Sequence, residues 1–364
     1  MVIMSKIKKA ILTGGGRATR LRPITTTINK HLIPLANKPM IFHAIEKAVE
    51  AGIEEIYINT NPGETQIPDA VGDGSRWGIK VVCFEQEGGP QGIAHVVKCA
   101  EKFIGNDPFM FYLSDNIVLG SLVPLFEVFE RESLDCMLAL SKVPDPERFG
   151  VPEFDASGKL IDIIEKPKNP PSDFAVTGIY LYASNFFKAF DHIEKSPRGE
   201  YEISSIHSYF LKNGYKVGYR EITGWWKDTG KPNDLIAANQ LLFGELPASV
   251  FRLEGSCLAD TRQEGKVAVG KNTVMGKNVS LRGPLIIGEG CYLENCSIGP
   301  YTTIGSNTTV KNTAIDNSIV FNNCRLETTE AITESIIGKD AVVLPRSEKG
   351  PHRLIIGDQT LVEL

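Results

Sequence analysis

Gly14, Gly15 and Gly16 follow an apolar run near the start of the chain, and the basic residues Arg20 and Lys30 come after them. A glycine turn behind a strand lets backbone N–H groups approach a phosphate chain closely, and the two basic side chains add positive charge. The pattern therefore indicates phosphate chemistry. Taken alone, the same residues would also fit a tight turn with basic residues on the surface.

This glycine turn matches neither of two common phosphate-binding motifs. No Gly-Lys-Ser/Thr follows the glycines at the distance that a Walker A loop requires. Gly14 and Gly16 fit the first two places of a dinucleotide fingerprint, but Thr19 stands where the third glycine belongs. These two classes of nucleotide site are therefore disfavoured.

Two aspartates come directly after predicted strands. Asp115 follows the apolar run 109–113, and Asp228 follows an aromatic run and precedes a glycine turn. Magnesium in phosphoryl transfer is usually held by one or two carboxylates together with phosphate oxygens and water. An isolated aspartate more often caps the next segment, so each of the two residues alone leaves both interpretations open.

The loop 86–92 carries candidates for binding a nucleotide base. Gln86 or Glu87 could read the polar edge of the base, and Gly92 would let the backbone lie against its ring. Further along, Gly150 and Gly178 interrupt apolar runs, where a ligand can approach the backbone. Each of these glycines is, on its own, more often a structural feature than a functional one.

Apolar, β-rich runs alternate with helical patterns through about residue 240. We predict strands at 9–12, 53–60, 79–85, 109–113 and 136–143, and helices at 40–51, 93–103 and 122–132. Such alternation predicts βαβ units and a mostly parallel, twisted sheet with helices on both faces. Ligands of these sheets bind beyond the carboxyl ends of the strands, which places the glycine turn, the loop 86–92 and the turn 114–116 at one edge.

The last third of the chain has a six-residue period. Aliphatic residues recur first every six positions and then after one five-residue step, at Val269, Met275, Leu281, Ile287, Leu293, Ile298, Ile304 and Val310. The spacing then loosens through Ile315, Ile319, Leu326, Ile336 and Ile337. This period predicts a parallel β-helix of hexapeptide repeats. The expected domains are residues 1–244 and 266–364, with a linker at 245–265.

Parallel β-helices either carry acyltransferase sites with a basic histidine or mediate assembly. The sole histidine after residue 244 is His352, outside the regular repeats, so acyl transfer is disfavoured and a homo-oligomer is expected. A net charge of -5 gives no basic footprint for nucleic acid. Seven cysteines without metal-binding spacing indicate reduced thiols, and no apolar run is long enough to span a membrane, so a cytoplasmic protein is expected.

The segment 15–40 resembles the signature of the sugar-1-phosphate nucleotidyltransferases, Gly-Gly-x-Gly-Thr-Arg-Leu, then Pro, then Lys-x-Leu-x-Pro and Lys-Pro-Met. Residues 15–21, Pro23, 30–34 and 38–40 carry the match. Nearly the whole chain is similar to the long form of the glucose-1-phosphate thymidylyltransferases. The chain departs from the pattern at Ala18 and Ser114, which stand where these enzymes usually have glycine, and the loop 86–92 has one extra residue.

The resemblance implies a Rossmann-like sheet domain followed by a left-handed β-helix. It also implies Mg²⁺-dependent transfer of a nucleotidyl group from dTTP to glucose 1-phosphate, giving dTDP-glucose and pyrophosphate. The implied catalytic residues are Arg20, Lys30 and Lys166, and the implied metal ligands are Asp115 and Asp228. The implied nucleotide-binding residues are Gly14, Gly15, Gly16, Thr19, Gln86, Glu87, Gly92 and Asp115. The implied sugar-phosphate-binding residues are Gly150, Glu165, Lys166 and Gly178.

Two other functions stay open. The chain could use UTP or another nucleoside triphosphate, or act on amino sugars as part of a bifunctional enzyme. It could also be a catalytically silent, regulatory homologue that binds sugar nucleotides. The presence of Lys30, Asp115 and Asp228 argues against a silent homologue, whereas Ala18 in the glycine turn leaves it open.

Overall fold

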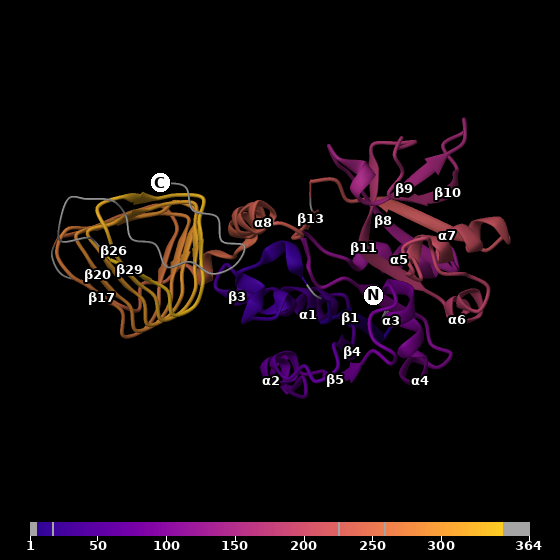
Figure 1. Cartoon of the computed structure of the whole chain (residues 1–364), viewed down its shortest axis with the longest axis horizontal. Helices are drawn as coiled ribbons and strands as arrows, with labels where there is room; N and C mark the ends of the chain where they lie inside the picture. The colour runs from indigo at the N-terminus through magenta and orange to yellow at the C-terminus, as the bar shows by residue number, and fades with distance from the viewer. Residues whose placement is uncertain (1–5, 17, 225, 258–259, 345–364) are drawn as a thin grey trace. The chain divides into compact units, whose positions relative to one another are not determined.

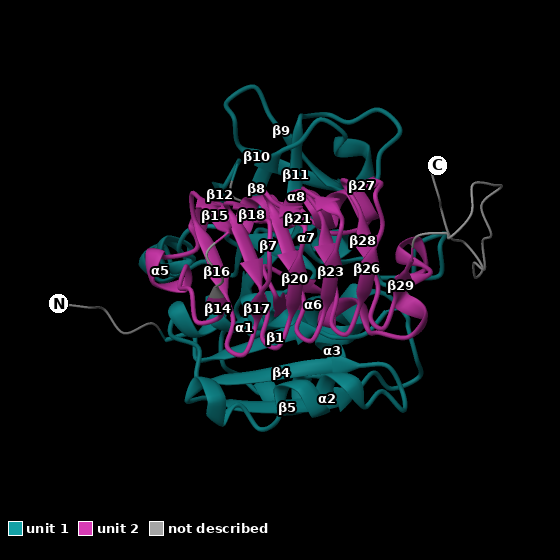
Figure 2. Ribbon diagram, turned by 90° about the vertical axis from the view of Figure 1, so that its left-hand side faces the viewer, with its two compact units in different colours: residues 1–17, 41–226 teal, residues 18–40, 227–364 magenta. Residues whose placement is uncertain are grey.

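The computed structural model describes residues 6–16, 18–224, 226–257 and 260–344 (Figure 1). It divides into two compact units, Met1–Arg17 with Ile41–Trp226, and Ala18–Met40 with Lys227–Leu364 (Figure 2). The signature segment is therefore divided: its glycines belong to the first unit, and Arg20 and Lys30 belong to the second. The domain limits expected from the sequence, 1–244 and 266–364, remain a prediction.

The first unit is built on a seven-stranded sheet with the order β12-β8-β11-β6-β1-β4-β5. Strand β1 pairs in parallel with β4 and β6, and β11 is antiparallel to both of its neighbours. The inner residues of β1 are fully buried, as expected for a central strand covered on both faces. The predicted mostly parallel sheet is confirmed. The strands are β1 (Lys9–Thr13), β4 (Glu55–Thr60), β5 (Lys80–Glu85), β6 (Phe109–Tyr112), β8 (Cys136–Lys142), β11 (Phe174–Tyr182) and β12 (Val217–Glu221).

Helices connect these strands. They are α1 (Met40–Glu50), α2 (Gln66–Val71), α3 (Ile93–Cys99), α4 (Glu101–Ile104), α5 (Val123–Arg131), α6 (Asn185–Phe190) and α7 (Ile203–Lys212). The helix predicted at 93–103 is broken at Ala100, whose N–H donates to Val97 O at 3.0 Å and closes the last turn of α3. This unit and its border also contain short strand pairs, formed by β7 (Asn116–Val118), β9 (Gly150–Phe154), β10 (Leu160–Glu165) and β13 (Trp226–Asp228), and the 3-10 helices η4 (Ser75–Trp77) and η5 (Pro146–Arg148).

His207 on α7 is fully buried in the core of the first unit. Its Nε2 lies 2.6 Å from the hydroxyl of Tyr182 on β11. Within the described part of the chain, its Nδ1 has no hydrogen-bond partner. Burial lowers the pKa of His207 to about 3, because a charged imidazolium would lose its hydration there.

We expect this histidine to make the fold sensitive to acid. Its pKa is lower in the folded chain than in the unfolded chain, so its contribution to stability is complete above pH 6.5 and falls as the pH drops toward 3. The loss is about 1.4 kcal/mol per pH unit. Urea unfolding of the parent protein and of His207→Gln should give a stability difference that changes with about this slope between about pH 6 and pH 4. Both of these pH values lie between the pKa of the unfolded chain, 6.5, and that of the folded chain, about 3. A pH-independent difference would contradict the prediction.

The second unit contains a parallel β-helix with three sheets, as predicted from the six-residue period. Their orders are β14-β17-β20-β23-β26-β29, β15-β18-β21-β24-β27 and β16-β19-β22-β25-β28. The repeating aliphatic residues from Val269 to Val310 are buried in its interior. The all-parallel arrangement is that expected of a left-handed β-helix. Its strands are β14 (Ser256–Cys257), β15 (Thr261–Glu264), β16 (Val267–Val269), β17 (Val274–Met275), β18 (Val279–Arg282), β19 (Leu285–Ile287), β20 (Tyr292–Glu294), β21 (Cys296–Ile298), β22 (Thr302–Ile304), β23 (Thr309–Lys311), β24 (Ala314–Ile315), β25 (Ile319–Val320), β26 (Arg325–Glu327), β27 (Ala331–Ile332), β28 (Ile336–Ile337) and β29 (Val342–Val343).

Asparagines stack at corners of the β-helix. Asn278, Asn295 and Asn312 have φ values of 53°, 48° and 54°, in the left-handed region that asparagine tolerates better than most residues. Their side chains form a ladder, with Asn278 Nδ2 donating to Asn295 Oδ1 at 3.0 Å and Asn295 Nδ2 to Asn312 Oδ1 at 3.3 Å. The corner positions are thus filled by a residue type that their backbone favours.

Helix α8 (Pro232–Glu245) and the hairpin of β2 (Pro34–Leu35) and β3 (Lys38–Pro39) are held to the β-helix by two asparagines. The N–H of Ala36, in the hairpin turn, donates to Asn239 Oδ1 on α8 at 2.7 Å. Asn37 Nδ2 donates to Ile304 O at 2.8 Å, and Asn239 Nδ2 to Tyr301 O at 3.4 Å. These bonds explain why the segment that follows Lys30 belongs to the same compact unit as the β-helix. Among the described residues, no helix is both long and apolar enough to cross a membrane.

Candidate active site

The glycine turn is fixed against the carboxyl end of β4 by two asparagines. The N–H of Gly14 donates to Asn59 O at 2.9 Å. The side chain of Asn61 contacts Gly16 twice, accepting from its N–H at 3.0 Å and donating to its carbonyl at 3.1 Å. A Cβ at Gly14 would lie 2.9 Å from Asn59 O, and Gly16 has a φ of 115°. Close packing thus requires a glycine at position 14, and the backbone conformation requires one at position 16.

Ser114 places Asp115 beside the glycine turn. Its N–H donates to Thr13 Oγ1 at 2.9 Å, and its hydroxyl donates to Thr13 O. Thr13 is the last residue of β1 and directly precedes Gly14, so the expected proximity of the turns after β1 and β6 is present. A glycine at position 114 could not make the hydroxyl contact. The serine is therefore an additional attachment between the two turns.

Asn116 connects three parts of the first unit and is almost completely buried. Its Nδ2 donates to Asp115 Oδ1 at 2.9 Å, while its Oδ1 accepts from Gly178 N at 3.2 Å and from Trp226 Nε1 at 2.5 Å. A Cβ at Gly178 would lie 2.9 Å from Asn116 Cγ and 2.7 Å from Leu113 Cβ, so this position of β11 needs glycine. One side chain thus joins a predicted metal ligand to a predicted sugar-phosphate residue.

The loop 86–92 is attached to the segment that precedes α7. Gln86 is buried, and its Nε2 lies 3.1 Å from Nδ1 of His95. Gly92 has a φ of 103°, and a Cβ there would lie 2.5 Å from Tyr201 O. The backbone of Tyr201 is therefore enough to explain the glycine. Glu87 is exposed, 3.5 Å from Lys102 in a surface ion pair. The roles of Gln86, Glu87 and Gly92 toward a nucleotide stay predictions.

Glu165 and Lys166 lie at the end of β10, beside Gly150 at the start of β9. Gly150 is the register partner of Glu165, and the N–H of Lys166 donates to Phe149 O at 2.9 Å. Lys166 Nζ lies 3.0 Å from Glu165 Oε1. The backbone of Lys166 has a φ of 44°, which costs energy for a residue with a side chain and is typical of ligand-binding positions. The structure thus brings three predicted sugar-phosphate residues together.

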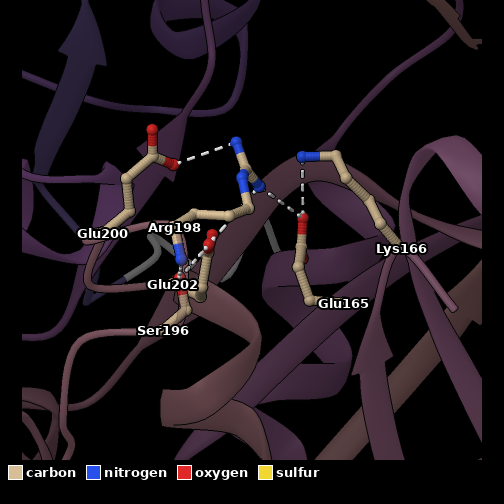
Figure 3. Close-up of polar contacts among 6 residues, drawn as sticks. All are labelled: Glu165, Lys166, Ser196, Arg198, Glu200 and Glu202. Atoms are coloured by element: carbon tan, nitrogen blue, oxygen red, sulfur yellow. Dashed lines mark hydrogen bonds and ion pairs between the residues drawn. The ribbon is translucent and has the colours of Figure 1, made fainter.

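Arg198 joins the same cluster, and the sequence analysis did not single it out. Its guanidinium lies 4.0 Å from Glu165, 3.1 Å from Glu200 and 3.4 Å from Glu202 (Figure 3). Ser196 Oγ donates to Glu202 Oε1 at 2.8 Å. Burial raises the pKa of Glu202, while Ser196 and Arg198 oppose that rise. Arg198 directly precedes the Gly-Glu-Tyr-Glu run that leads into α7. A basic residue next to two glutamates was the sequence feature that could have identified it.

The remaining predicted site residues belong to the second unit. Thr19 and Arg20 form part of the 3-10 helix η1 (Thr19–Leu21), and Lys30 begins η3 (Lys30–Leu32). Asp228 ends β13, two residues after the Trp226 that contacts Asn116. Arg17 of the signature segment and Trp225 of the aromatic run before Asp228 lie outside the described residues. The functions of Thr19, Arg20, Lys30 and Asp228 remain predictions.

Ala18 has the left-handed conformation that glycine would adopt without strain, with φ 44° and ψ 38°. Its carbonyl accepts from Thr25 Oγ1 at 2.8 Å and from Leu21 N at 3.1 Å. We expect Ala18→Gly to remove a penalty of about 1 kcal/mol and to lower the KM for the nucleotide by up to about fivefold. Initial rates at varied nucleotide concentration test this expectation. An unchanged KM would show that the position is neutral.

Residues 9–244 match the family described as nucleotidyl transferase, which is more than half of the chain. The chain belongs to the nucleotidyl transferase family. The resemblance inferred from the signature segment is thereby confirmed, and the protein is an enzyme of the nucleotidyltransferase type. Over the described ranges, no group of three or more histidines, cysteines and acids could by itself hold a metal ion.

Relatives of this nucleotidyltransferase extend over both units. The low-salt glycan biosynthesis nucleotidyltransferase of Haloferax volcanii is 36% identical over 360 residues, covering 98% of this chain and 100% of the relative. The glucose-1-phosphate thymidylyltransferase of Streptomyces griseus is 36% identical over 360 residues, covering 98% and 99%. A crystal structure from Bacillus anthracis, named as a candidate glucose-1-phosphate thymidylyltransferase, is 39% identical with a TM-score of 0.60, covering 64% of this chain and 94% of that one.

Proposed function

We propose that this nucleotidyltransferase transfers a nucleotidyl group from dTTP to glucose 1-phosphate in a Mg²⁺-dependent reaction that gives dTDP-glucose and pyrophosphate. The observation that carries the proposal is Asn116, which hydrogen-bonds both to Asp115 and to the backbone of Gly178. Asp115, which we assign to the nucleotide, and Gly178 on β11, which we assign to the sugar phosphate, are thereby held together in the first unit. Relatives of nearly full coverage bear the name glucose-1-phosphate thymidylyltransferase, which supports this substrate pair.

The reaction needs no protein base. A phosphate monoester is already largely ionised at neutral pH, so an oxygen of the sugar phosphate can attack the α-phosphorus directly. The pyrophosphate then leaves in line with the attack. The bond between the α-phosphorus and the oxygen of the leaving pyrophosphate breaks, and its electron pair stays on that oxygen. Catalysis consists mainly of positioning the two substrates and stabilising their charge.

The cluster around Lys166 supplies the sugar-phosphate side of this mechanism. Lys166 and Arg198 are its two cations, and both face the carboxylate of Glu165 (Figure 3). Both cations can bind a phosphate, and Glu165 can accept a hydrogen bond from a sugar hydroxyl. Glu200 and Glu202 hold the guanidinium of Arg198 in place. We propose that Arg20 and Lys30 bind the phosphates of the nucleotide.

Mg²⁺ would be held by Asp115 and Asp228 together with phosphate oxygens. Carboxylate oxygens are the ligands this hard cation prefers, so the donor set fits it. Asn116 fixes the Asp115 carboxylate through a hydrogen bond at 2.9 Å, as supporting residues do for metal ligands. When bound, the ion would neutralise charge on the phosphates. Because the seven scattered cysteines indicate reduced thiols, we also propose a cytoplasmic location.

A matrix of nucleoside triphosphates against sugar 1-phosphates, with Mg²⁺ present, tests the proposal through release of pyrophosphate. We expect the highest kcat/KM for dTTP with glucose 1-phosphate. A higher value for UTP or for another sugar would replace the proposed substrates while keeping the reaction. No pyrophosphate from any pair would favour the catalytically silent, regulatory homologue.

A further inference from the structure

The side-chain amide of Gln86 is bound at its nitrogen and open at its oxygen. Gln86 follows β5, at the same edge of the parallel strands β1, β4 and β5 as the glycine turn, and its backbone N–H donates to Thr60 O at 3.2 Å. Its Nε2 lies 3.1 Å from Nδ1 of His95 on α3. Over the described ranges, its Oε1 has no hydrogen-bond partner, yet this oxygen is not completely buried. A ligand can therefore reach it.

The ring of His95 is held in place by its neighbours. It stacks on Tyr201, with the two ring centroids 6.1 Å apart at an interplanar angle of 19°. The Sγ of Cys99, one helical turn further along α3, lies 3.7 Å from Nδ1 and 3.8 Å from Nε2. The backbone of Tyr201 is itself anchored, since its N–H donates to Gln91 O at 2.8 Å and its carbonyl accepts from Ala94 N at 3.1 Å. The position of the imidazole therefore determines that of the amide.

The surroundings of His95 favour its neutral form. Burial lowers the pKa of the imidazole, the charge of Lys195 lowers it further, and the charge of Glu87 opposes both. The ammonium of Lys195 lies 5.3 Å from the centroid of the Tyr201 ring on which His95 stacks. A neutral imidazole carries one proton, and with the amide nitrogen of Gln86 facing Nδ1 this proton belongs on Nε2. Nδ1 is then an acceptor, which attracts the amide nitrogen and repels the amide oxygen.

An amide held in this orientation offers a base one donor and one acceptor in a fixed order. His95 uses one hydrogen of Gln86 Nε2, and the other hydrogen lies beside Oε1. This pair matches thymine or uracil, whose O4 accepts from Nε2 while its N3–H donates to Oε1. Cytosine presents the reverse order, with a donor at N4 and an acceptor at N3. It would need the amide turned over, which would point the amide oxygen at the lone pair of Nδ1.

We propose that His95 is a positioning residue, which sets the orientation of the Gln86 amide and thereby makes the site prefer thymine and uracil nucleotides to cytosine nucleotides. The inference rests on the proposed function, in which Gln86 contacts the base, and His95 itself touches no substrate. A side chain at position 95 that only accepts hydrogen bonds should keep this preference, and one that only donates should reverse it. A residue that merely packs against Tyr201 would show no such dependence.

The ratio of the dissociation constants for dCTP and dTTP, measured by isothermal titration calorimetry without sugar phosphate, tests the inference. Both nucleotides carry the same triphosphate, so an altered charge at position 95 acts on both and cancels in the ratio. His95→Leu should lower the parental preference for dTTP about tenfold. His95→Asp, which only accepts, should keep it within about threefold, and His95→Lys, which only donates, should make dCTP the tighter ligand. The control is His192→Leu, an exposed histidine stacked on Tyr209, which should bind like the parent.

The pH dependence of this ratio supplies a second readout. An imidazolium donates from both nitrogens, so lowering the pH from about 7.5 to about 5.5 should reduce the preference for dTTP in the parent but not in His95→Asp. A parent without preference for dTTP, or an equal ratio in the parent, His95→Leu and His95→Lys, would overturn the inference. If the ratio responds to position 95 but no pyrophosphate is released with any sugar 1-phosphate, the proposed reaction fails and the inference stands, so the two failures are distinguishable.

Discussion

Asp115→Asn should lower kcat by about a thousandfold while leaving the folded structure intact, because an amide is a far weaker ligand for Mg²⁺ than a carboxylate. The variant should still fold, because the hydrogen bonds of Ser114 to Thr13 and of Asn116 to Gly178 hold this turn without the Asp115 carboxylate. Pyrophosphate release at saturating substrates measures the effect. Thermal unfolding shows whether the variant keeps its stability.

The same substitution at Asp228 should have a similar effect. The matched control is Asp69→Asn, an exposed aspartate on α2 that no part of the proposed mechanism uses. It should retain the parental kcat. Turnover in Asp115→Asn or Asp228→Asn within a factor of two of the parent would remove that residue from the metal site.

Lys166→Met should lower kcat/KM for the sugar phosphate by about a hundredfold to a thousandfold, equivalent to about 2.7–4 kcal/mol of lost transition-state stabilisation. Methionine keeps the length and the apolar stem of the side chain but removes the charge. The KM for the nucleotide should change little, because Lys166 lies in the cluster with Glu165 and Arg198. Initial rates with each substrate varied in turn separate these effects.

The control for this variant is Lys168→Met, an exposed lysine two residues further along the chain. It should leave both KM values unchanged. If Lys166→Met instead raised only the KM for the nucleotide, Lys166 would belong to the nucleotide side of the site. Equal kinetics for Lys166→Met and the parent would remove the residue from the mechanism.

The sheet and the β-helix could be predicted because both repeat a physical requirement along many residues. The interior of the β-helix is lined mainly by aliphatic residues that recur once per repeat, so a period appears without knowledge of neighbouring coils. Where the coil length changes, the period alone fails. In β25 the residue that continues the interior series is Val320, the register partner of Ile304, and not the expected Ile319.

The polar residues that organise the site could not be predicted in the same way. Asn59, Asn61 and Asn116 each act through contacts with segments distant in the sequence, which no local spacing shows. The role of Arg198 similarly depends on its contact with Glu165, which lies at the end of β10 and is distant in the sequence. Glycines were easier to identify than to interpret. Gly92 and Gly178 are required by close backbone or side-chain neighbours whatever their role toward a ligand.

The central claim is that Asp115 and Asp228 hold one cation together with the nucleotide. Binding of Mn²⁺ in the presence of the preferred nucleoside triphosphate, measured by electron paramagnetic resonance, tests it most directly. If the two aspartates share one cation, each single Asp→Asn change should weaken Mn²⁺ binding at least tenfold, and the double variant should be weakened by less than the product of the two effects. Independent, multiplicative effects, or no effect of one substitution, would contradict a shared cation.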